Sequence, residues 1–114
     1  MIARELLKGS LRSIVLKLLA DSGRMYGYEI TRKVEELTEG KIKLTYGALY
    51  PILHKLEVDG ALATESENFN NRIRIYYQLT PKGNSFAQEK IAEMEEFIDV
   101  ISALLKPNIQ TNYG

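Results

Sequence analysis

The sequence contains no cysteine, no tryptophan and only one histidine, His54. Without cysteine, the chain can form no disulfide framework, no thiolate metal site and no CxxC redox centre. A single histidine cannot build a multi-histidine metal centre, so among enzyme sites only a Ser-His-carboxylate arrangement stays conceivable. We therefore expect a protein that is not an enzyme and that binds neither a metal nor another cofactor.

The sequence also lacks an excess of charge and a long hydrophobic run. Fifteen Lys and Arg residues balance fifteen Asp and Glu residues, so a basic patch for a polyanion must be local. Near the N-terminus, Lys8, Arg12 and Lys17 interrupt the apolar residues, too soon for a secretory signal or a membrane span. We therefore expect a cytoplasmic protein that makes no contact with a membrane.

What is present is the composition of an ordinary globular domain. Of the 114 residues, 45% are hydrophobic and 26% are charged, which excludes disorder of the whole chain. This length allows one domain with a modest core and at most one appended element.

Helical periodicity dominates the first half of the chain. Apolar residues recur at helical spacing over residues 6–19 and again over residues 30–37, which predicts two helices. Residues 41–44 alternate between charged and apolar, the pattern of a short strand. Thr45 then offers its hydroxyl as the N-cap of a third helix over about residues 46–59.

The second half of the chain changes period. Polar and apolar residues alternate over residues 62–66 and 72–79, and the Asn-rich segment 68–71 lies between them. This pattern predicts a β-hairpin with its turn at the asparagines. Because neighbours on a strand point to opposite faces, we expect Tyr77 to point inward and Tyr76 outward.

A long helix follows the hairpin. Thr80 and Pro81 are a typical helix start, and from Ala87 onward apolar residues are spaced 4, 3, 4, 3 and 4 residues apart. That period of about 3.5 marks a coiled-coil seam. The helix could lie back on its own domain, but about 25 residues span roughly 37 Å, more than a domain of about 80 residues covers. Its length therefore favours pairing with a second copy, with contacts at Leu7, Leu11, Phe86, Ile91, Met94, Phe97, Ile98, Ile101 and Leu105.

This order of elements predicts a mainly α fold with a small β-wing. Residues 1–80 are expected to form a winged helix-turn-helix, residues 81–106 a dimerisation helix and residues 107–114 a polar tail. In a winged helix-turn-helix the third helix enters a DNA groove.

The outward side of the third helix is poor in charge. Opposite its apolar stripe lie Gly47, Pro51 and His54, flanked by Tyr50 and Lys55. Small residues let a backbone approach closely, and tyrosine and histidine donate hydrogen bonds to phosphates or base edges. Because few of these side chains read bases strongly, we expect much indirect or water-mediated readout.

Each of these side chains also has a plain structural explanation. His54 is either a groove contact or merely exposed. Tyr46 and Tyr50 either stack on each other over the edge of the core or bind phosphates. Arg72 and Arg74 either line a solvated strand face or reach DNA from the wing.

Three runs of the sequence point to a known family. Residues 27–30 (Gly-Tyr-Glu-Ile), 49–57 (Leu-Tyr-Pro-Ile-Leu-His-Lys-Leu-Glu) and 76–83 (Tyr-Tyr-Gln-Leu-Thr-Pro-Lys-Gly), with Arg74, closely resemble the PadR family of bacterial transcriptional regulators. The single C-terminal helix is similar to the short branch of that family. The resemblance implies a homodimeric repressor that dimerises mainly through the last helix and binds a pseudo-palindromic operator. Some members also bind flat aromatic compounds between the two chains.

The residue pattern and the resemblance together nominate a set of DNA-binding residues. The set is Tyr28, Thr45, Tyr46, Gly47, Ala48, Tyr50, Pro51, His54, Lys55, Arg72, Arg74 and Tyr76. Ile75 stands where family members often have lysine, and the Asn-rich tip replaces a Gly-rich basic one, so weaker wing contacts are expected. Drug-sensing members carry a tryptophan on the last helix, which this chain lacks. The binding site of a small aromatic effector is therefore left unassigned, with Met94 and Phe97 as its candidate residues.

We therefore expect a dimeric DNA-binding repressor, in which an effector would shift the separation of the two wings. Two other classes stay open. A winged-helix module that binds another protein would show no salt-dependent DNA binding. A small enzyme would pair His54 with a carboxylate, but Glu57 and Asp59 have no nucleophile at helical spacing beside them.

Overall fold

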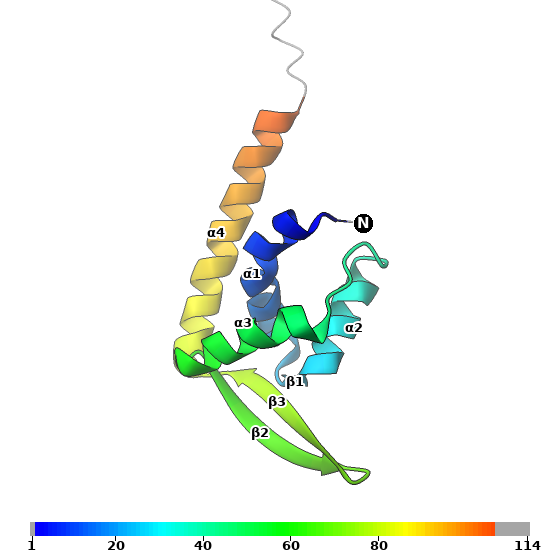
Figure 1. The fold of residues 1–114 in the computed structure, drawn as a ribbon. Coiled ribbons are helices and arrows are strands. Elements are labelled where there is room, and N and C mark those ends of the chain that lie inside the picture. Colours follow the sequence, from blue (N-terminus) through cyan, green and yellow to red (C-terminus); the bar gives the residue numbers. More distant parts are fainter. Residues whose placement is uncertain (1, 107–114) are drawn as a thin grey trace, which may run out of the picture.

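The computed structural model describes residues 2–106, and Figure 1 shows how its elements are arranged. In chain order the elements are α1 (Arg4–Ser22), β1 (Met25–Tyr26), α2 (Gly27–Leu37), α3 (Tyr46–Val58), β2 (Leu62–Phe69), β3 (Arg72–Leu79) and α4 (Pro81–Leu105). The prediction of a mainly α fold with a small β-wing is confirmed. The polar tail expected over residues 107–114 lies outside the described residues.

Local chemistry accounts for where the helices begin and end. The Thr45 hydroxyl accepts a hydrogen bond from the Ala48 N–H at 3.1 Å, so it caps the N-terminus of α3 as predicted. Gly23 ends α1 at a φ of 79°, a left-handed conformation that costs glycine little.

The core lies between the first three helices and the base of the sheet. Leu62 on β2 and Tyr77 on β3 close it from the sheet side, and Ala87 closes it from α4. Fully burying a leucine contributes about 1.5–3 kcal/mol, so the leucines of α1 and α3 dominate the stability of the domain. The largest fully buried side chains are Leu16, Leu19, Ile30, Leu49, Leu53, Leu56 and Val15.

The sheet has three antiparallel strands in the order β1-β3-β2. Of these three strands, sequence reasoning predicted β2 and β3 but not β1. In strand β1, Met25 pairs with Tyr77 and Tyr26 pairs with Tyr76. A strand of two residues is too short to show an alternating pattern, so the sequence carried no signal for it.

The short strand expected over residues 41–44 is wrong, because this segment forms no strand. It buries Leu44, packs Ile42 against the core, and accepts a hydrogen bond at the Lys41 carbonyl from the N–H of Ile2 at 3.1 Å. The edge of β3 that β2 leaves free is already paired with β1. Residues 41–44 therefore cannot pair with the central strand β3.

The hairpin of β2 and β3 forms the wing. Its turn contains Asn70 at a φ of 49° and Asn71 at a φ of 64°, and asparagine tolerates this left-handed region better than most residues. Tyr77 is buried and Tyr76 is half-buried, as the alternation of the strand predicted.

Helix α4 has two parts with different surroundings. In its anchored part, residues 81–91, the Thr80 hydroxyl accepts a hydrogen bond from the Gly83 N–H at 2.9 Å and donates one to the Gly60 carbonyl at 2.6 Å. Its distal part, residues 94–105, runs past α1 and away from the domain (Figure 1). The exposed apolar side chains of the distal part are Phe97, Ile98, Val100, Leu104 and Leu105.

Across residues 2–106, the helices are all too short or too polar to cross a membrane. The same residues bring together no group of three or more His, Asp or Glu side chains that could hold a metal ion.

Candidate nucleic-acid interface

Three aromatic side chains stand on successive turns of α3 and form what we call the aromatic ladder: Tyr46, Tyr50 and His54. The ring centroids of Tyr46 and Tyr50 are 5.7 Å apart, and those of Tyr50 and His54 are 5.9 Å apart and stacked. Tyr46 and Tyr50 nevertheless remain 52% and 45% exposed. The rings of the two tyrosines therefore pack against each other at a tilt of 41°, while both side chains remain partly open to solvent.

Tyr46, at the N-terminal end of the aromatic ladder, packs against the start of α2. A Cβ placed on Gly27, the first residue of α2, would lie 2.4 Å from Cε1 of Tyr46, so a larger residue at this position would displace the Tyr46 ring. Burial, and next the neighbouring Tyr46 side chain, raise the pKa of the Tyr77 phenol. Sequence reasoning gave Gly27 no role, although a glycine at a helix start was a usable signal.

The other predicted positions of α3 surround the ladder. Gly47, Ala48 and Pro51 are all exposed, so their small surfaces leave the helix backbone open to close approach. Pro51 has no N–H and therefore gives no helix hydrogen bond to the Gly47 carbonyl. Lys55 is exposed but forms an ion pair with Asp59 at 3.2 Å, which offsets its charge.

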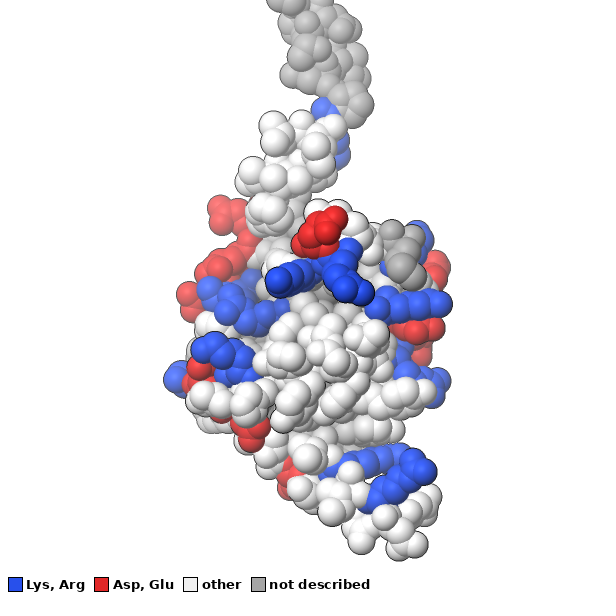
Figure 2. All heavy atoms as spheres, viewed as in Figure 1, with Lys and Arg blue, Asp and Glu red and all other residues white. Residues whose placement is uncertain are grey.

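The charged residues of α3 are Lys55 and Glu57. Figure 2 shows an uncharged area over α3, with Lys and Arg side chains on both sides of it and Asp and Glu side chains among them. Cations at the margins suit phosphate contacts, whereas an uncharged centre with hydroxyl, imidazole and small groups suits the floor of a groove.

The wing carries its two arginines on one face. Residues 72, 74 and 76 share that face, because side chains alternate along β3. The Arg74 guanidinium lies over two rings, 3.8 Å from the centroid of Phe69 and 4.4 Å from that of Tyr26. Phe69 is an apolar residue beside the hairpin turn, and the cation–π contact with Arg74 accounts for its position there. Arg72 is exposed, and Tyr76 packs edge-on against Tyr26 at 5.3 Å.

The opposite face of the wing points toward α3. Tyr77 lies on this face, as does Thr64, whose hydroxyl contacts the Glu57 carboxylate of α3 at 3.3 Å. Further out, Ile73 is 75% exposed and Ile75 is 46% exposed. The sheet therefore separates the arginines of the wing from the aromatic ladder of α3. The sequence pattern did not predict that these two groups of residues lie on opposite sides of the sheet.

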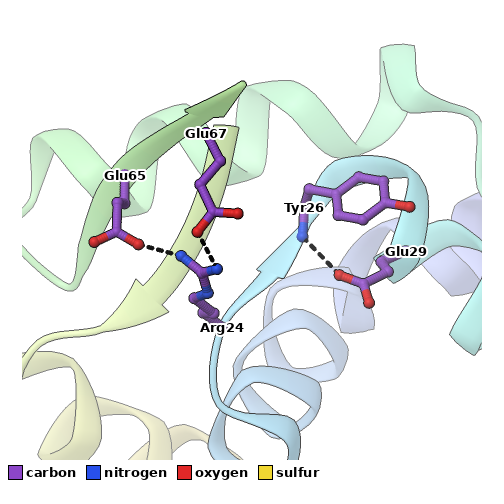
Figure 3. A network of polar contacts seen from close by, with 5 residues as sticks. All are labelled: Arg24, Tyr26, Glu29, Glu65 and Glu67. Carbon is purple, nitrogen blue, oxygen red and sulfur yellow. Dashed lines mark hydrogen bonds and ion pairs between the residues drawn. The ribbon is translucent and has the colours of Figure 1, made fainter. Parts of the chain in front are cut away.

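A polar network ties the base of the wing to the segment before β1 (Figure 3). Arg24 forms ion pairs with Glu65 and Glu67 on β2. Its guanidinium lies 4.1 Å from the ring centroid of Tyr76 on β3. The hydrogen bond with Glu67 raises the pKa of Arg24 above its usual value, so this side chain stays charged.

Next to this network, the backbone N–H of Tyr26 donates a hydrogen bond to the Glu29 carboxylate at 3.1 Å. This contact stabilises the first turn of α2. Tyr28, the remaining predicted DNA contact, is exposed on that turn, and the Arg32 guanidinium lies 5.8 Å from its ring centroid.

The residues expected at a dimer contact fall into three groups. Leu11 is only 4% exposed and belongs to the core of its own chain, so it offers little surface to a partner. Phe97, Ile98 and Leu105 are exposed. The half-buried members are Leu7, Phe86, Ile91, Met94 and Ile101.

Of the two residues suggested for an effector site, Met94 lines a cleft and Phe97 does not. Met94 lines an apolar cleft of about 380 Å³ between α1, α2 and α4, whose walls also include Ile14, Val34 and Ile91. Phe97 does not line this cleft.

Comparison with known proteins agrees with this geometry. The model of the transcriptional regulator PadR-like family matches residues 15–89. A transcriptional regulator of Mycobacterium tuberculosis is 33% identical over 93 residues, which cover 82% of this chain and 83% of that protein. A transcriptional regulator from Clostridium thermocellum has a TM-score of 0.80 at 28% identity, over 90% of this chain and 99% of that one. A PadR family transcriptional regulator from Eggerthella lenta has a TM-score of 0.74 at 32% identity, over 91% of this chain and 88% of that one.

Proposed function

The chain belongs to the PadR-like family of transcriptional regulators, and from this premise we propose that it is a homodimeric repressor that binds a specific DNA operator. The observation that carries the proposal is the aromatic ladder on the uncharged outer face of α3, bordered by cations. A helix with this surface fits a major groove, where base edges line the floor and phosphates line both rims.

Helix α3 contacts DNA through its ladder and its small residues. The hydroxyls of Tyr46 and Tyr50 and the imidazole of His54 donate hydrogen bonds to phosphates or base edges. Gly47 and Ala48 let the helix backbone lie close to the groove floor. Because the ladder contains no arginine or asparagine to read a base pair bidentately, much of the specificity comes from DNA shape and bridging water.

The wing contributes contacts on both of its faces. A wing tip that enters a minor groove about 6 Å wide has one phosphate strand on each side. Arg74 and Arg72 contact the phosphate strand on the side of the wing away from α3. Ile73 and Ile75, on the other side, add only apolar contact, so the wing is a weaker binder than a basic one.

Dimerisation takes place through the distal part of α4. Its exposed apolar side chains include Phe97 and Ile98, and a second copy related by a two-fold axis would cover them. Two subunits arranged in this way present two copies of α3 about 34 Å apart, one turn of DNA, as half-sites of an operator require.

A flat apolar effector occupies the cleft beside Met94 between α1, α2 and α4. A ligand there borders both the winged domain and the dimerising helix. Binding shifts the relative position of the two winged domains, which changes the spacing of the α3 helices and releases the operator.

The test is a fluorescence anisotropy titration of the purified protein with its own upstream DNA, at two salt concentrations and with random DNA as competitor. Tyr50→Ala is expected to weaken operator binding by about 10- to 150-fold, because a hydrogen bond to a charged group contributes about 1.5–3 kcal/mol. Tyr50→Phe, which keeps the stacked ring and removes only the hydroxyl, separates the hydrogen bond from the stacking. Both variants should retain the dimer and the melting temperature of the natural chain.

Tight, competitor-resistant and salt-sensitive binding that Tyr50→Ala weakens supports the repressor. Binding no tighter than to random DNA contradicts it and favours a module that binds another protein. Repeating the titration with a planar aromatic dye tests the effector, since a ligand of the cleft should release DNA at dye concentrations that saturate the protein.

A further inference from the structure

Arg24 crosses the whole sheet. It lies between α1 and β1, at one edge of the strand order β1-β3-β2, yet its ion-pair partners Glu65 and Glu67 belong to β2 at the other edge. On the way, its guanidinium stacks over Tyr76 of the central strand. Figure 3 shows the guanidinium between the two carboxylates.

The strand register gives Glu67 a second cation within reach. Glu67 is directly opposite Arg74 in the pairing of β2 with β3, and Glu65 is directly opposite Tyr76. Cross-strand neighbours of opposite charge normally pair, because their Cβ atoms are only about 5 Å apart. Glu67 instead pairs with Arg24.

Arg74 is thereby left without a carboxylate. Within residues 2–106 it takes part in no ion pair, and its guanidinium rests between the rings of Phe69 and Tyr26. A stacked guanidinium keeps its edge N–H groups free, and these are the groups that bind a phosphate.

We propose that Arg24 is a positioning residue for DNA binding, which occupies Glu67 and so holds Arg74 on its aromatic support, available to a phosphate of the operator. The inference rests on the proposed function, from which it takes DNA as the ligand of Arg74. Arg24 itself need not touch DNA, because its guanidinium is ion-paired with the carboxylates of Glu65 and Glu67.

The first test compares operator affinities of Arg24→Gln, Arg24→Gln with Glu67→Gln, and Arg24→Gln with Glu65→Gln. In Arg24→Gln, Glu67 should draw Arg74 into a cross-strand pair, and the operator Kd should rise about tenfold, as expected when an arginine contact is lost. The slope of log K against log salt should fall by about 0.9 for each lost phosphate contact.

The two double variants have the same net charge and serve as matched controls. Only Glu67 is opposite Arg74, so Glu67→Gln should restore the affinity of Arg24→Gln to within about threefold of the natural chain, and Glu65→Gln should not. Equal rescue by both changes would overturn the proposal in favour of a general charge effect. Rescue by neither would mean that Arg24 contacts DNA itself.

A second test needs no DNA. In the natural chain, the rings of Phe69 and Tyr26 should shift the NMR signals of the Arg74 Nε–H and Cδ protons upfield. In Arg24→Gln these shifts should be lost, and Glu67→Gln should restore them. Unchanged Arg74 signals in Arg24→Gln would overturn the positioning role, whatever the protein binds. If the natural chain binds no DNA but the Arg74 signals respond as stated, the proposed function fails and the intramolecular role of Arg24 stands.

Discussion

The anchored and distal parts of α4 belong to one continuous helix of 25 residues but have opposite surroundings. The only buried residues of α4, Gly83 and Ala87, lie in the anchored part. In the distal part, Phe97, Ile98 and Leu104 are 59%, 54% and 75% exposed. Apolar side chains recur along both parts, so the helix pattern alone does not reveal which of them the domain covers.

A heptad pattern predicts that apolar side chains of the helix are buried, but it does not say whether they pack against the same domain or against another chain. In the anchored part, Gly83 lies against the backbone of Ala61, just before β2, and Phe86 contacts Arg12 of α1. The distal part extends beyond the domain (Figure 1). Contiguous exposed apolar surface on a small protein usually marks an interaction site. The anchored part thus stabilises the protomer, and the distal part is the surface that we propose to dimerise.

The largest effect is expected from a substitution that disrupts the packing of the anchored part of α4 against the domain. In Gly83→Ala, the new Cβ would lie 1.9 Å from the Ala61 carbonyl oxygen. Because the obstacle is backbone, we expect the free energy of unfolding to fall by about 3 kcal/mol. Chemical denaturation followed by circular dichroism measures this.

The same substitution at Gly9, inside α1, is the matched control. A Cβ on Gly9 meets nothing within 4 Å, so Gly9→Ala should stabilise the protein by about 0.5–1 kcal/mol through helix propensity. Equal effects at the two glycines would show that the close approach of α4 to Ala61 is unimportant.

The distal part is tested by Ile98→Glu. A carboxylate on the seam would be desolvated in the dimer, so the dimer Kd should rise by about a hundredfold, or about 2.7 kcal/mol. The melting temperature of the protomer should not change, since Ile98 is exposed in it. Analytical ultracentrifugation gives the Kd, with Ala103→Glu as a control that places the same charge elsewhere on the distal part. A dimer that survives Ile98→Glu would place the interface elsewhere.

The smallest effect is expected at Thr80, which marks where the anchored part of α4 begins. Thr80→Ala removes the hydroxyl that accepts from Gly83 and donates to the Gly60 carbonyl. The loss of an N-cap of this kind costs about 1–2 kcal/mol. Thermal unfolding should detect it, whereas Ser85→Ala, at an exposed serine of the same helix, should change stability by less than about 0.5 kcal/mol. Indistinguishable curves for the two variants would refute a capping role for Thr80.

Much of the fold was predictable because its signals are local. Thr45 and Thr80 cap helices through hydrogen bonds that reach three residues along the chain, and a cap of this kind can be identified from a short window of sequence. The turn at Asn70 and Asn71 was predictable for the same reason. Residues 41–44 were mistaken for a strand because alternation shows which side chains are buried but not whether a neighbouring strand exists.

The candidate site was predicted in part. The exposed positions on α3 followed from helical periodicity, since residues opposite a buried stripe face outward. Contact between Tyr46 and Tyr50 was one of two alternatives that their i, i+4 spacing allowed, whereas the stacking of His54 on Tyr50 was not predicted. The separation of Arg74 from α3 by the sheet did not follow, because it depends on which face of the wing the helices cover.

The sequence by itself determined the helices, the hairpin and the outward set of residues on α3, because each depends on contacts between residues close in the chain. Only the tertiary structure decided that β1 would join the sheet, that Arg24 would pair with Glu65 and Glu67, and which residues of α4 the domain would bury. Arg24 lies 41 and 43 residues from its two carboxylates. Which distant groups come together is set by strand order, register and packing.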